Sequence, residues 1–246
     1  SLACWGESGD GELGPHAPWD ADVPVQAAGL AGVKAVTASV KHTCAVAGHL
    51  SAVYCWGQNE EGQLGDGTTT SRLTPTGTLG LTHVRSLAAS NGSTCAARWD
   101  GTLWCWGDGE HGTLGIGYSD AVLSPTQVTS LSDVHEVAGG YGFACARLGD
   151  GTARCWGYGG AGRLGDGMWH TSTSPVVVGA PLTNISRIAT GGHHACAIVD
   201  GALYCWGEGS WGRLGTGNDD DQPSPVSVLD ATNIVDVSPG KGSHTC

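Results

Sequence analysis

The order of apolar and polar residues along the chain indicates short β-strands rather than helices. Residues 33–39 alternate between apolar and polar side chains, residues 43–47 form a short apolar run, and residues 52–56 are rich in β-forming residues. Alternation of this kind is typical of a half-buried strand. A fourth strand is expected around Pro75. No stretch of helical length keeps a period of about 3.6 residues, so we predict an all-β fold.

The same group of strands recurs five times. The triplet Cys-Trp-Gly begins at residues 4, 55, 105, 155 and 205, and each triplet is followed by Gly-x-Leu-Gly, which begins at residues 11, 62, 112, 162 and 212. Asp-Gly pairs at 100–101, 150–151 and 200–201 separate two strands of their repeats, and Asp-Gly favours the tight turns of β-hairpins. Repeats of about 50 residues with four short strands are typical of β-propeller blades. A solenoid is the alternative, but it needs polar capping repeats, and none is visible.

The repeat resembles a known family. The segment Trp-Gly-Gln-Asn-Glu-Glu-Gly-Gln-Leu-Gly-Asp-Gly at residues 56–67 looks like the signature of the regulator-of-chromosome-condensation repeat, and residues 42–46 resemble the family's His-Ser/Thr-x-Ala-Leu strand. The resemblance covers essentially the whole chain. It implies a β-propeller and binding roles such as nucleotide-exchange regulation, enzyme inhibition or scaffold assembly. The best-known member has seven blades, so five repeats imply either a smaller ring or part of a longer one.

The two ends of the chain favour a complete five-bladed ring. Residues 243–246 (Ser-His-Thr-Cys) and residues 2–6 (Leu-Ala-Cys-Trp-Gly), joined head to tail, make one more copy of the blade core without its hairpin turn. Pairing of the N- and C-terminal strands would remove two exposed sheet edges. We therefore expect a single propeller domain over residues 1–246, with one blade shared by both termini.

The ten cysteines form two groups of five that keep the phase of the repeat. Within a repeat the two cysteines occupy facing positions of a hairpin, and the remaining two would meet at the ring closure. The predicted disulfides are Cys44–Cys55, Cys95–Cys105, Cys145–Cys155, Cys196–Cys205 and Cys4–Cys246. Zinc binding is the alternative, but the chain has no Cys-x-x-Cys pair and two cysteines per blade do not make a zinc site. Because disulfides persist in oxidising compartments, we expect a secreted, extracellular or periplasmic protein.

Composition and charge narrow the class of partner. The formal net charge is −12, and only 11 Lys and Arg residues are scattered along the chain. Nucleic-acid affinity comes mostly from basic side chains that neutralise phosphates, so we predict no binding to DNA or RNA. No apolar run approaches the roughly 20 residues that a membrane helix needs, so we predict no membrane insertion.

Two patterns could suggest a cofactor or a metal ion. Three repeats contain Gly-x-Gly-x-x-Gly, which begins at Gly107, Gly157 and Gly207. A dinucleotide site needs this loop to open a helix, whereas Leu-Gly follows here, so we expect turns and no cofactor. The acidic run Asp219, Asp220 and Asp221 offers oxygen ligands that Ca²⁺ accepts. It lacks calcium-loop spacing, so it is a weak metal candidate and a solvated turn is favoured.

The histidines follow the repeat. His42, His194 and His244 occupy one repeat position, two residues before a cysteine, which Ser93 and Phe143 fill in the other repeats. Three imidazoles around one circle could bind a metal ion. A hydrogen bond from each histidine to a neighbouring turn is the favoured interpretation, because residues that recur with the repeat serve its architecture.

The tryptophans separate into two sets. Those of the Cys-Trp-Gly triplets recur with the repeat and are expected in the core. Among the others, some lie in loops, and exposed tryptophan is enriched where proteins grip partners or sugars. Burial of these tryptophans against a neighbouring loop is equally compatible with the sequence. The candidate binding residues are Trp169, His170, Trp211, Trp19 and His111.

These observations favour a secreted protein-interaction or assembly module that is not an enzyme, since no catalytic group stands apart from the repeat. The nucleotide-exchange role does not suit a disulfide-rich chain. Two alternatives stay open: a lectin-like carbohydrate-binding module that uses loop Trp and His residues, and a structural subunit of an extracellular multimer. The fold alone does not choose among them.

Overall fold

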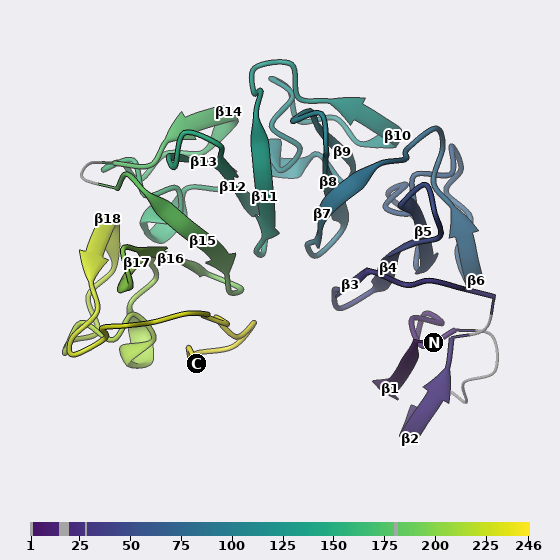
Figure 1. The fold of residues 1–246 in the computed structure, drawn as a ribbon, viewed down its shortest axis with the longest axis horizontal. Helices are drawn as coiled ribbons and strands as arrows, with labels where there is room; N and C mark the ends of the chain where they lie inside the picture. Colours follow the sequence, from purple (N-terminus) through teal and green to yellow (C-terminus); the bar gives the residue numbers. More distant parts are fainter. Residues whose placement is uncertain (1, 15–19, 28, 180–181) are drawn as a thin grey trace.

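The chain folds into a row of β-sheets. The structure is a computed structural model that describes residues 2–14, 20–27, 29–179 and 182–246. One two-stranded and four four-stranded antiparallel sheets lie side by side along an arc (Figure 1). Each four-stranded sheet keeps the order of the chain, as in a propeller blade. The predicted all-β architecture with four-stranded blades is therefore confirmed.

The strands and turns have the following bounds. The two-stranded sheet contains β1 (Ala3–Glu7) and β2 (Asp20–Gln26). Blade I contains β3 (Ala35–Ala38), β4 (His42–Ala47), β5 (Ala52–Gly57) and β6 (Arg72–Gly77). Blade II contains β7 (Val84–Ala89), β8 (Ser93–Arg98), β9 (Leu103–Gly107) and β10 (Val122–Gln127). Blade III contains β11 (Val134–Gly139), β12 (Phe143–Leu148), β13 (Ala153–Gly157) and β14 (Ser172–Val177). Blade IV contains β15 (Ile185–Thr190), β16 (His194–Val199), β17 (Ala202–Gly207) and β18 (Gln222–Ser227). Short 3-10 turns η1 (Glu110–Gly112), η2 (Gly160–Gly162) and η3 (Ser210–Gly212) follow the third strands of blades II to IV.

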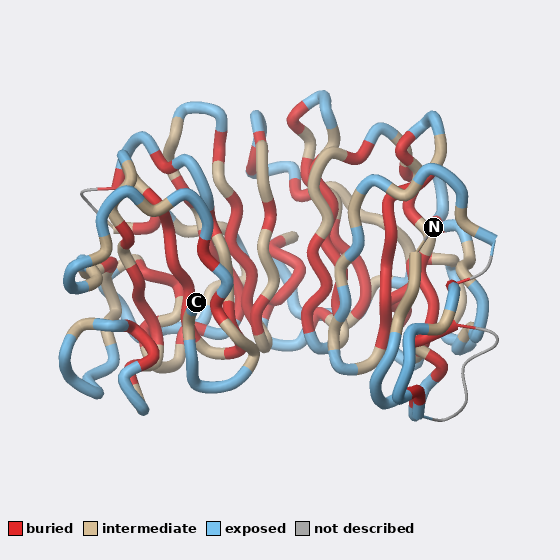
Figure 2. The backbone as a smooth tube through the Cα atoms, turned by 60° about the horizontal axis from the view of Figure 1, so that its bottom comes forward, coloured by how far each residue is buried: buried red, intermediate tan, exposed pale blue. Residues whose placement is uncertain are grey.

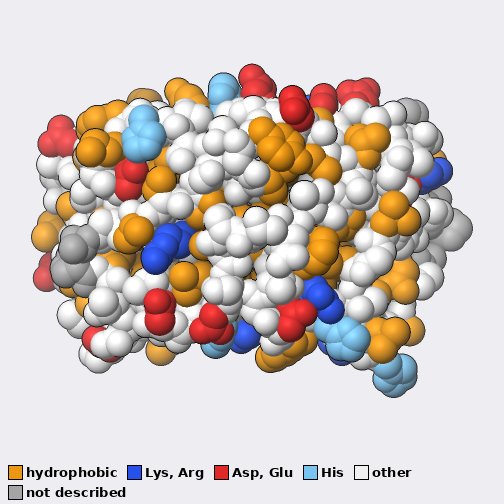
Figure 3. Space-filling model, turned by 90° about the horizontal axis from the view of Figure 1, so that it is seen from above, with side chains coloured by type: hydrophobic (Ala, Val, Ile, Leu, Met, Phe, Trp, Pro, Cys, Tyr) orange, Lys and Arg blue, Asp and Glu red, His pale blue; other side chains and the backbone are white. Residues whose placement is uncertain are grey.

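The first strand of each blade is the innermost one. Strands β3, β7, β11 and β15 contact one another in succession, and together they line a concave channel of about 540 Å³. Buried backbone runs through the blades, whereas the loops at their two ends are exposed (Figure 2). The outermost strands form the rim, where apolar side chains are spread among few charged ones (Figure 3).

Neighbouring blades are joined by buried tryptophans of the Cys-Trp-Gly triplets. Four of them are fully buried, and each donates its indole N–H to a backbone carbonyl in the Gly-x-Leu-Gly turn of the preceding repeat. The bonds are Trp56 to Glu12 (2.7 Å), Trp106 to Gln63 (2.9 Å), Trp156 to Thr113 (2.9 Å) and Trp206 to Arg163 (3.1 Å). A buried indole N–H needs such an acceptor. The Gly-x-Leu-Gly turn of one repeat and the Cys-Trp-Gly triplet of the next are therefore joined in the same way at each of these four interfaces.

The glycines of the Gly-x-Leu-Gly turn are required by the close approach of the next blade. Gly112 has φ +76°, and a Cβ there would lie 2.5 Å from the Thr173 Cα of blade III. Gly162 has φ +74° and is equally close to Pro223 of blade IV. Neither position tolerates a larger residue without backbone movement. The interpretation of these glycines as turn residues is therefore confirmed, and a 3-10 turn rather than an α-helix begins in this region.

Four of the five predicted disulfides are present. In each blade the two cysteines pair directly across the hairpin of the second and third strands, and their side chains are almost entirely buried. The bridges are Cys44–Cys55, Cys95–Cys105, Cys145–Cys155 and Cys196–Cys205. Facing positions in an antiparallel hairpin bring two Cβ atoms close enough for this bond.

The fifth predicted bridge and the closure of the ring are not formed. Cys4 and Cys246 are free, and the two termini lie on opposite sides of a wide gap in the arc (Figure 1). Strand β1 pairs with β2, and residues 238–246 pair with one another, through two backbone hydrogen bonds between Ser238 and Cys246 and a bridge between Pro239 and Thr245. Trp5, which was expected in the core with its counterparts, is 64% exposed.

Candidate functional site

The loops that follow the third strand of each blade lie on one face of the arc. Antiparallel pairing places Ser93, where β8 begins, opposite Gly107, where β9 ends. The loop that follows the third strand therefore lies at the same edge as the link between the first and second strands. We call the face formed by residues 58–71, 108–121, 158–171 and 208–221 the loop face. The hairpins between second and third strands, such as residues 99–102, lie on the opposite face.

Trp211 protrudes from the loop face in an unusual backbone conformation. It has φ +64° inside η3 and its side chain is 81% exposed. His111 and Ala161 occupy the same position in η1 and η2, with φ +60° and +59°. The repeat thus imposes this left-handed conformation, which is uncommon for residues other than Gly, Asn and Asp. An exposed Trp held there is a feature of blade IV alone among these three blades, and such strained positions cluster at functional sites.

The other predicted loop residues are spread over the loop face. Trp169 is 55% exposed in the loop of blade III. His170 follows it, with Nε2 3.8 Å from Asp166 Oδ2. Trp19 lies outside the described residues. The structure therefore distributes Trp169, His170, Trp211 and His111 over blades II to IV and does not bring them into one pocket.

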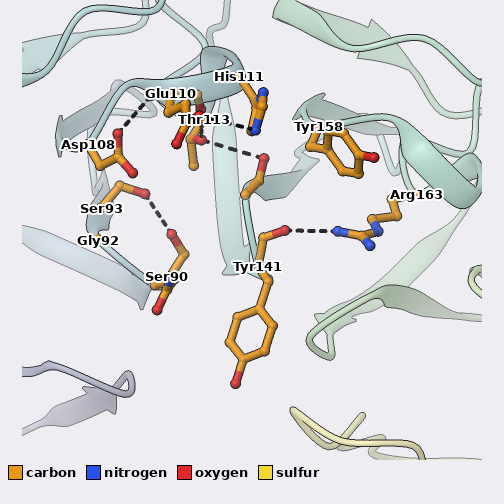
Figure 4. A pocket seen from close by; sticks show the side chains of 12 residues that line it. Ser90, Gly92, Ser93, Asp108, Glu110, His111, Thr113, Tyr141, Tyr158 and Arg163 are labelled. Atoms are coloured by element: carbon orange, nitrogen blue, oxygen red, sulfur yellow. Dashed lines mark hydrogen bonds and ion pairs between the residues drawn. The ribbon is translucent and has the colours of Figure 1, made fainter.

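One cavity on the loop face lies between blades II and III (Figure 4). It has a volume of about 260 Å³. Blade II contributes side chains that include Asp108, Glu110 and Thr113, and blade III contributes Tyr141, Tyr158 and Arg163; His111 is the one predicted binding residue that lines it.

The two sides of this cavity carry opposite charge. Asp108 lies on one side, where its Oδ1 accepts a 2.8 Å hydrogen bond from the peptide N–H of Glu110. Arg163 lies on the other side (Figure 4), with Nη1 3.1 Å from the Tyr141 carbonyl oxygen and its guanidinium 4.9 Å from the centre of the Tyr158 ring. Burial lowers the pKa of Arg163 from its ordinary value. The sequence carries one signal for this cavity, because Thr113 is short where the other repeats have Glu, Gln or Arg.

The acidic loop stabilises its own turns. Asp219 Oδ1 accepts a hydrogen bond from the Gly212 N–H (2.7 Å), and Asp221 Oδ1 accepts one from the Gly209 N–H (2.9 Å). Among the residues that the structure describes, no three His, Cys, Asp or Glu side chains converge on a point where a metal ion could bind. The weak metal candidates Asp219, Asp220 and Asp221 are therefore loop residues with local partners.

His42 links two blades rather than facing the channel. It is fully buried, with Nδ1 2.8 Å from Ser39 Oγ and Nε2 2.8 Å from Thr94 Oγ1. Because the Thr94 hydroxyl donates to the Gln63 carbonyl, Nε2 must carry the proton in the bond to Thr94. His194 makes the equivalent bond to Thr245, also at 2.8 Å. The structural interpretation of these two histidines is confirmed.

Acid is expected to destabilise the protein through these histidines. Burial lowers the pKa of His42 from 6.5 to about 3, and burial followed by the charge of Arg213 lowers the pKa of His194 to about 4. The unfolded chain binds these protons first, so stability is full above pH 6.5 and falls as the pH decreases toward 4. Urea unfolding at pH 7 and pH 4.5 should show a loss of roughly 5 kcal/mol, about half of it from each histidine.

The variant His42→Ser isolates this effect, since Ser93 occupies the same repeat position and bonds Ser90 Oγ at 2.6 Å. It should reduce the pH dependence between 7 and 4.5. The exposed His49 is the control, and His49→Ser should leave the dependence unchanged. An unchanged slope in His42→Ser would refute the assignment.

Structural comparisons match the chain to parts of longer proteins. Human WBSCR16 is 26% identical, with a TM-score of 0.82, and the match covers 94% of this chain and 63% of that protein. Prp20p from Saccharomyces cerevisiae is 20% identical with a TM-score of 0.82, covering 98% of this chain and 60% of that one. The ectodomain of the receptor kinase CR4 from Physcomitrella patens matches with a TM-score of 0.52 at 19% identity, covering 97% and 52%. The chain thus spans less than two thirds of these proteins.

No curated protein sequence matches the chain. Within the described part, no helix is long and apolar enough to cross a membrane. The family description "Regulator of chromosome condensation (RCC1) repeat" matches residues 51–97, 100–147 and 200–246, which together make up more than half of the chain. With the Cys-Trp-Gly and Gly-x-Leu-Gly units joined across each blade interface, the chain belongs to the regulator of chromosome condensation (RCC1) repeat family.

Proposed function

We propose that this protein is a non-catalytic protein-binding module that works in an oxidising compartment outside the cytoplasm, and that the loop face makes the contact. The exposed Trp211, held at positive φ, is the observation that carries this proposal. Exposed tryptophan is the residue most enriched among the anchors of protein interfaces. The backbone around Trp211 is fixed by the repeat, so little order has to be gained on binding.

The disulfides support the choice of compartment. Four buried bridges braced across hairpins are rare in cytosolic proteins, where thiols are kept reduced. The charge of the chain supports the class of partner, because a net charge of −12 attracts basic proteins and repels nucleic acids.

The comparisons are consistent with a binding role. The structural report on Prp20p names its binding to Gsp1p and histones, and a second one shows the same yeast protein bound to Kap60. These proteins share the propeller and are only 20–21% identical to this chain, so their partners are not carried over. What carries over as a proposal is that a propeller of this family presents its loops to other proteins.

Affinity capture from the native extracellular fluid, without reductant, tests the proposal. The wild-type protein should retain a stoichiometric protein partner. The double variant Trp169→Ala/Trp211→Ala should bind that partner at least about 30-fold more weakly, which is the loss of one strong interface anchor. Trp99, 65% exposed on the opposite face, provides the control, and Trp99→Ala should bind normally.

Two results would contradict the proposal. If the double variant and Trp99→Ala retain the partner equally, the contact lies elsewhere. If glycans rather than a protein are enriched, and the double variant loses them, the loop face serves carbohydrate recognition.

A further inference from the structure

The cavity between blades II and III occupies a repeat position that an arginine side chain fills elsewhere in the same chain. The position is the second residue of Gly-x-Leu-Gly. It holds Gln63, Thr113, Arg163 and Arg213 in blades I to IV. Its backbone carbonyl accepts an indole N–H from the next repeat in three of these cases. The four side chains therefore start from equivalent places beside their blade interfaces.

At the end of blade IV, Arg213 shows how a guanidinium is held there. Its side chain is 4% exposed. Nε donates to the Ser210 carbonyl oxygen (2.9 Å) and Nη1 donates to Glu208 Oε2 (3.2 Å). Nη2 donates to Ser243 Oγ (3.1 Å), which follows blade IV in the chain. A carbonyl, a carboxylate and a hydroxyl thus surround one guanidinium.

At the end of blade II two of these three acceptors have counterparts, the carboxylate and the carbonyl, whereas Gly142 stands at the position of Ser243 and has no hydroxyl. Asp108 stands where blade IV has Glu208, since the peptide N–H of each bonds to an equivalent loop carbonyl, Gly92 (2.9 Å) and His193 (3.0 Å). The carbonyl of Glu110 corresponds to that of Ser210 and accepts the hydroxyl of Thr113.

The short Thr113 side chain leaves the remaining space empty. That space is the cavity of about 260 Å³. The hydroxyls of Ser90 and Ser93, 2.6 Å apart, also line it.

The rim of the cavity suits a flat cation. The rings of His111 and Tyr158 lie with their centroids 5.1 Å apart and their planes tilted by 49°, and guanidinium groups stack on aromatic faces. Two carboxylates, Asp108 and Glu110, line the cavity against the single guanidinium of Arg163. Arg163 bonds the Tyr141 carbonyl through Nη1 and lies over the Tyr158 ring, while its buried Nε has no partner among the described residues. The residues described on the Asp108 side of the cavity include no Lys or Arg.

We propose that this cavity binds the guanidinium of an arginine side chain presented by a partner protein. The arginine would take the place at blade II that Arg213 takes at blade IV, with Asp108 as its carboxylate and the Glu110 carbonyl as its second acceptor. The proposal rests on the proposed function, because it gives the loop face one specific recognition element. It adds the chemistry of the partner, which must expose an arginine.

The probe for this proposal is N-acetyl-arginine methylamide, observed by saturation-transfer NMR and titrated by protein-observed NMR. The matching citrulline compound has the same shape without the charge. The arginine probe should shift resonances of Tyr141 and Tyr158, and the citrulline compound should bind at least about tenfold more weakly because charge-assisted hydrogen bonds are lost.

Variants test the individual contacts. Asp108→Asn should weaken binding of the arginine probe by about tenfold, whereas Glu208→Gln, at the equivalent position in blade IV, should leave it unchanged.

Thr113→Arg should abolish binding, since the protein would then fill its own cavity, and its Tm should not fall. Arg163→Gln should strengthen binding by removing a like charge, whereas an anionic ligand would be lost.

Equal binding of arginine and citrulline probes, or retained binding in a folded Thr113→Arg variant, would overturn the proposal. Loss of binding in Arg163→Gln would indicate an anion site instead. If the partner captured in the experiment above binds Thr113→Arg normally, the loop face binds protein and the arginine site is wrong. If no protein partner depends on the loop face, the proposed function itself fails, whatever the probe does.

Discussion

Reduction of the four disulfides is expected to lower the free energy of unfolding by about 10 kcal/mol. Each bridge spans 9 to 11 residues, and closing a loop of that size restricts the unfolded chain by roughly 2.5 kcal/mol. Folded domains have only about 5–15 kcal/mol of stability in total. The reduced chain should therefore be largely unfolded at 37 °C, and this also explains why a reducing compartment would not suit it.

Guanidinium unfolding with and without dithiothreitol, followed by tryptophan fluorescence, measures the effect. Because the sulfur atoms are buried, reduction should be slow in native buffer and fast in denaturant. The double variant Cys145→Ala/Cys155→Ala removes one bridge and should lose about 2–3 kcal/mol. If the reduced protein has an unchanged unfolding midpoint, the blade interfaces alone stabilise the fold. The stability of the protein would then give no reason for it to work in an oxidising compartment.

Replacement of Trp156 by alanine is expected to cost about 4 kcal/mol. The side chain is fully buried between blades II and III, packed in the core with residues such as Leu114 and Val128. Truncation of a buried Trp leaves a cavity that the surroundings fill only partly. The Thr113 carbonyl, which accepts the indole N–H at 2.9 Å, would also lose its partner.

Trp5 supplies the matched control, because it stands at the same position of the repeat and is 64% exposed. Trp5→Ala should change the free energy of unfolding by less than about 1 kcal/mol, as surface substitutions usually do. Chemical denaturation of both variants under oxidising conditions gives the comparison. A loss in Trp5→Ala as large as that in Trp156→Ala would mean that the ends of the arc meet in solution and bury Trp5.

The loop face and the blade interfaces are built from the same repeat, but they use different kinds of residue. The interfaces use the residues that recur, such as Trp156 and His42, and they are buried and hydrogen-bonded. The recognition elements use the residues that differ at the same positions. Trp211 replaces Ala161 on an identical turn, and Thr113 replaces Arg213 at an identical carbonyl. A repeat fold can vary these positions without loss of the fold, because the interfaces do not depend on them.

The architecture of a single blade was predictable from the sequence. Its strands, its hairpins and four disulfides follow from contacts between residues close in the chain, such as Cys145 opposite Cys155, and local pairing is specified by alternation and turn residues. The sequence also identified Trp169, His170 and Trp211 as loop residues, and their exposure or their position on the loop face agrees with that prediction.

The curvature of the arc and the shape of the cavity depend on contacts between residues that are far apart in the sequence. The phase of the repeat matched Cys246 to Cys4, but in the structure the ends of the arc lie apart and both cysteines are free. A small angular difference at each interface, added over successive blades, separates a closed ring from an open one. The short Thr113 is a sequence signal for the cavity, but its lining by Tyr158 of the next blade is a tertiary contact. Neither the curvature of the arc nor the lining of the cavity by Tyr158 is encoded by residues adjacent in sequence. The repeat pattern alone therefore does not specify them.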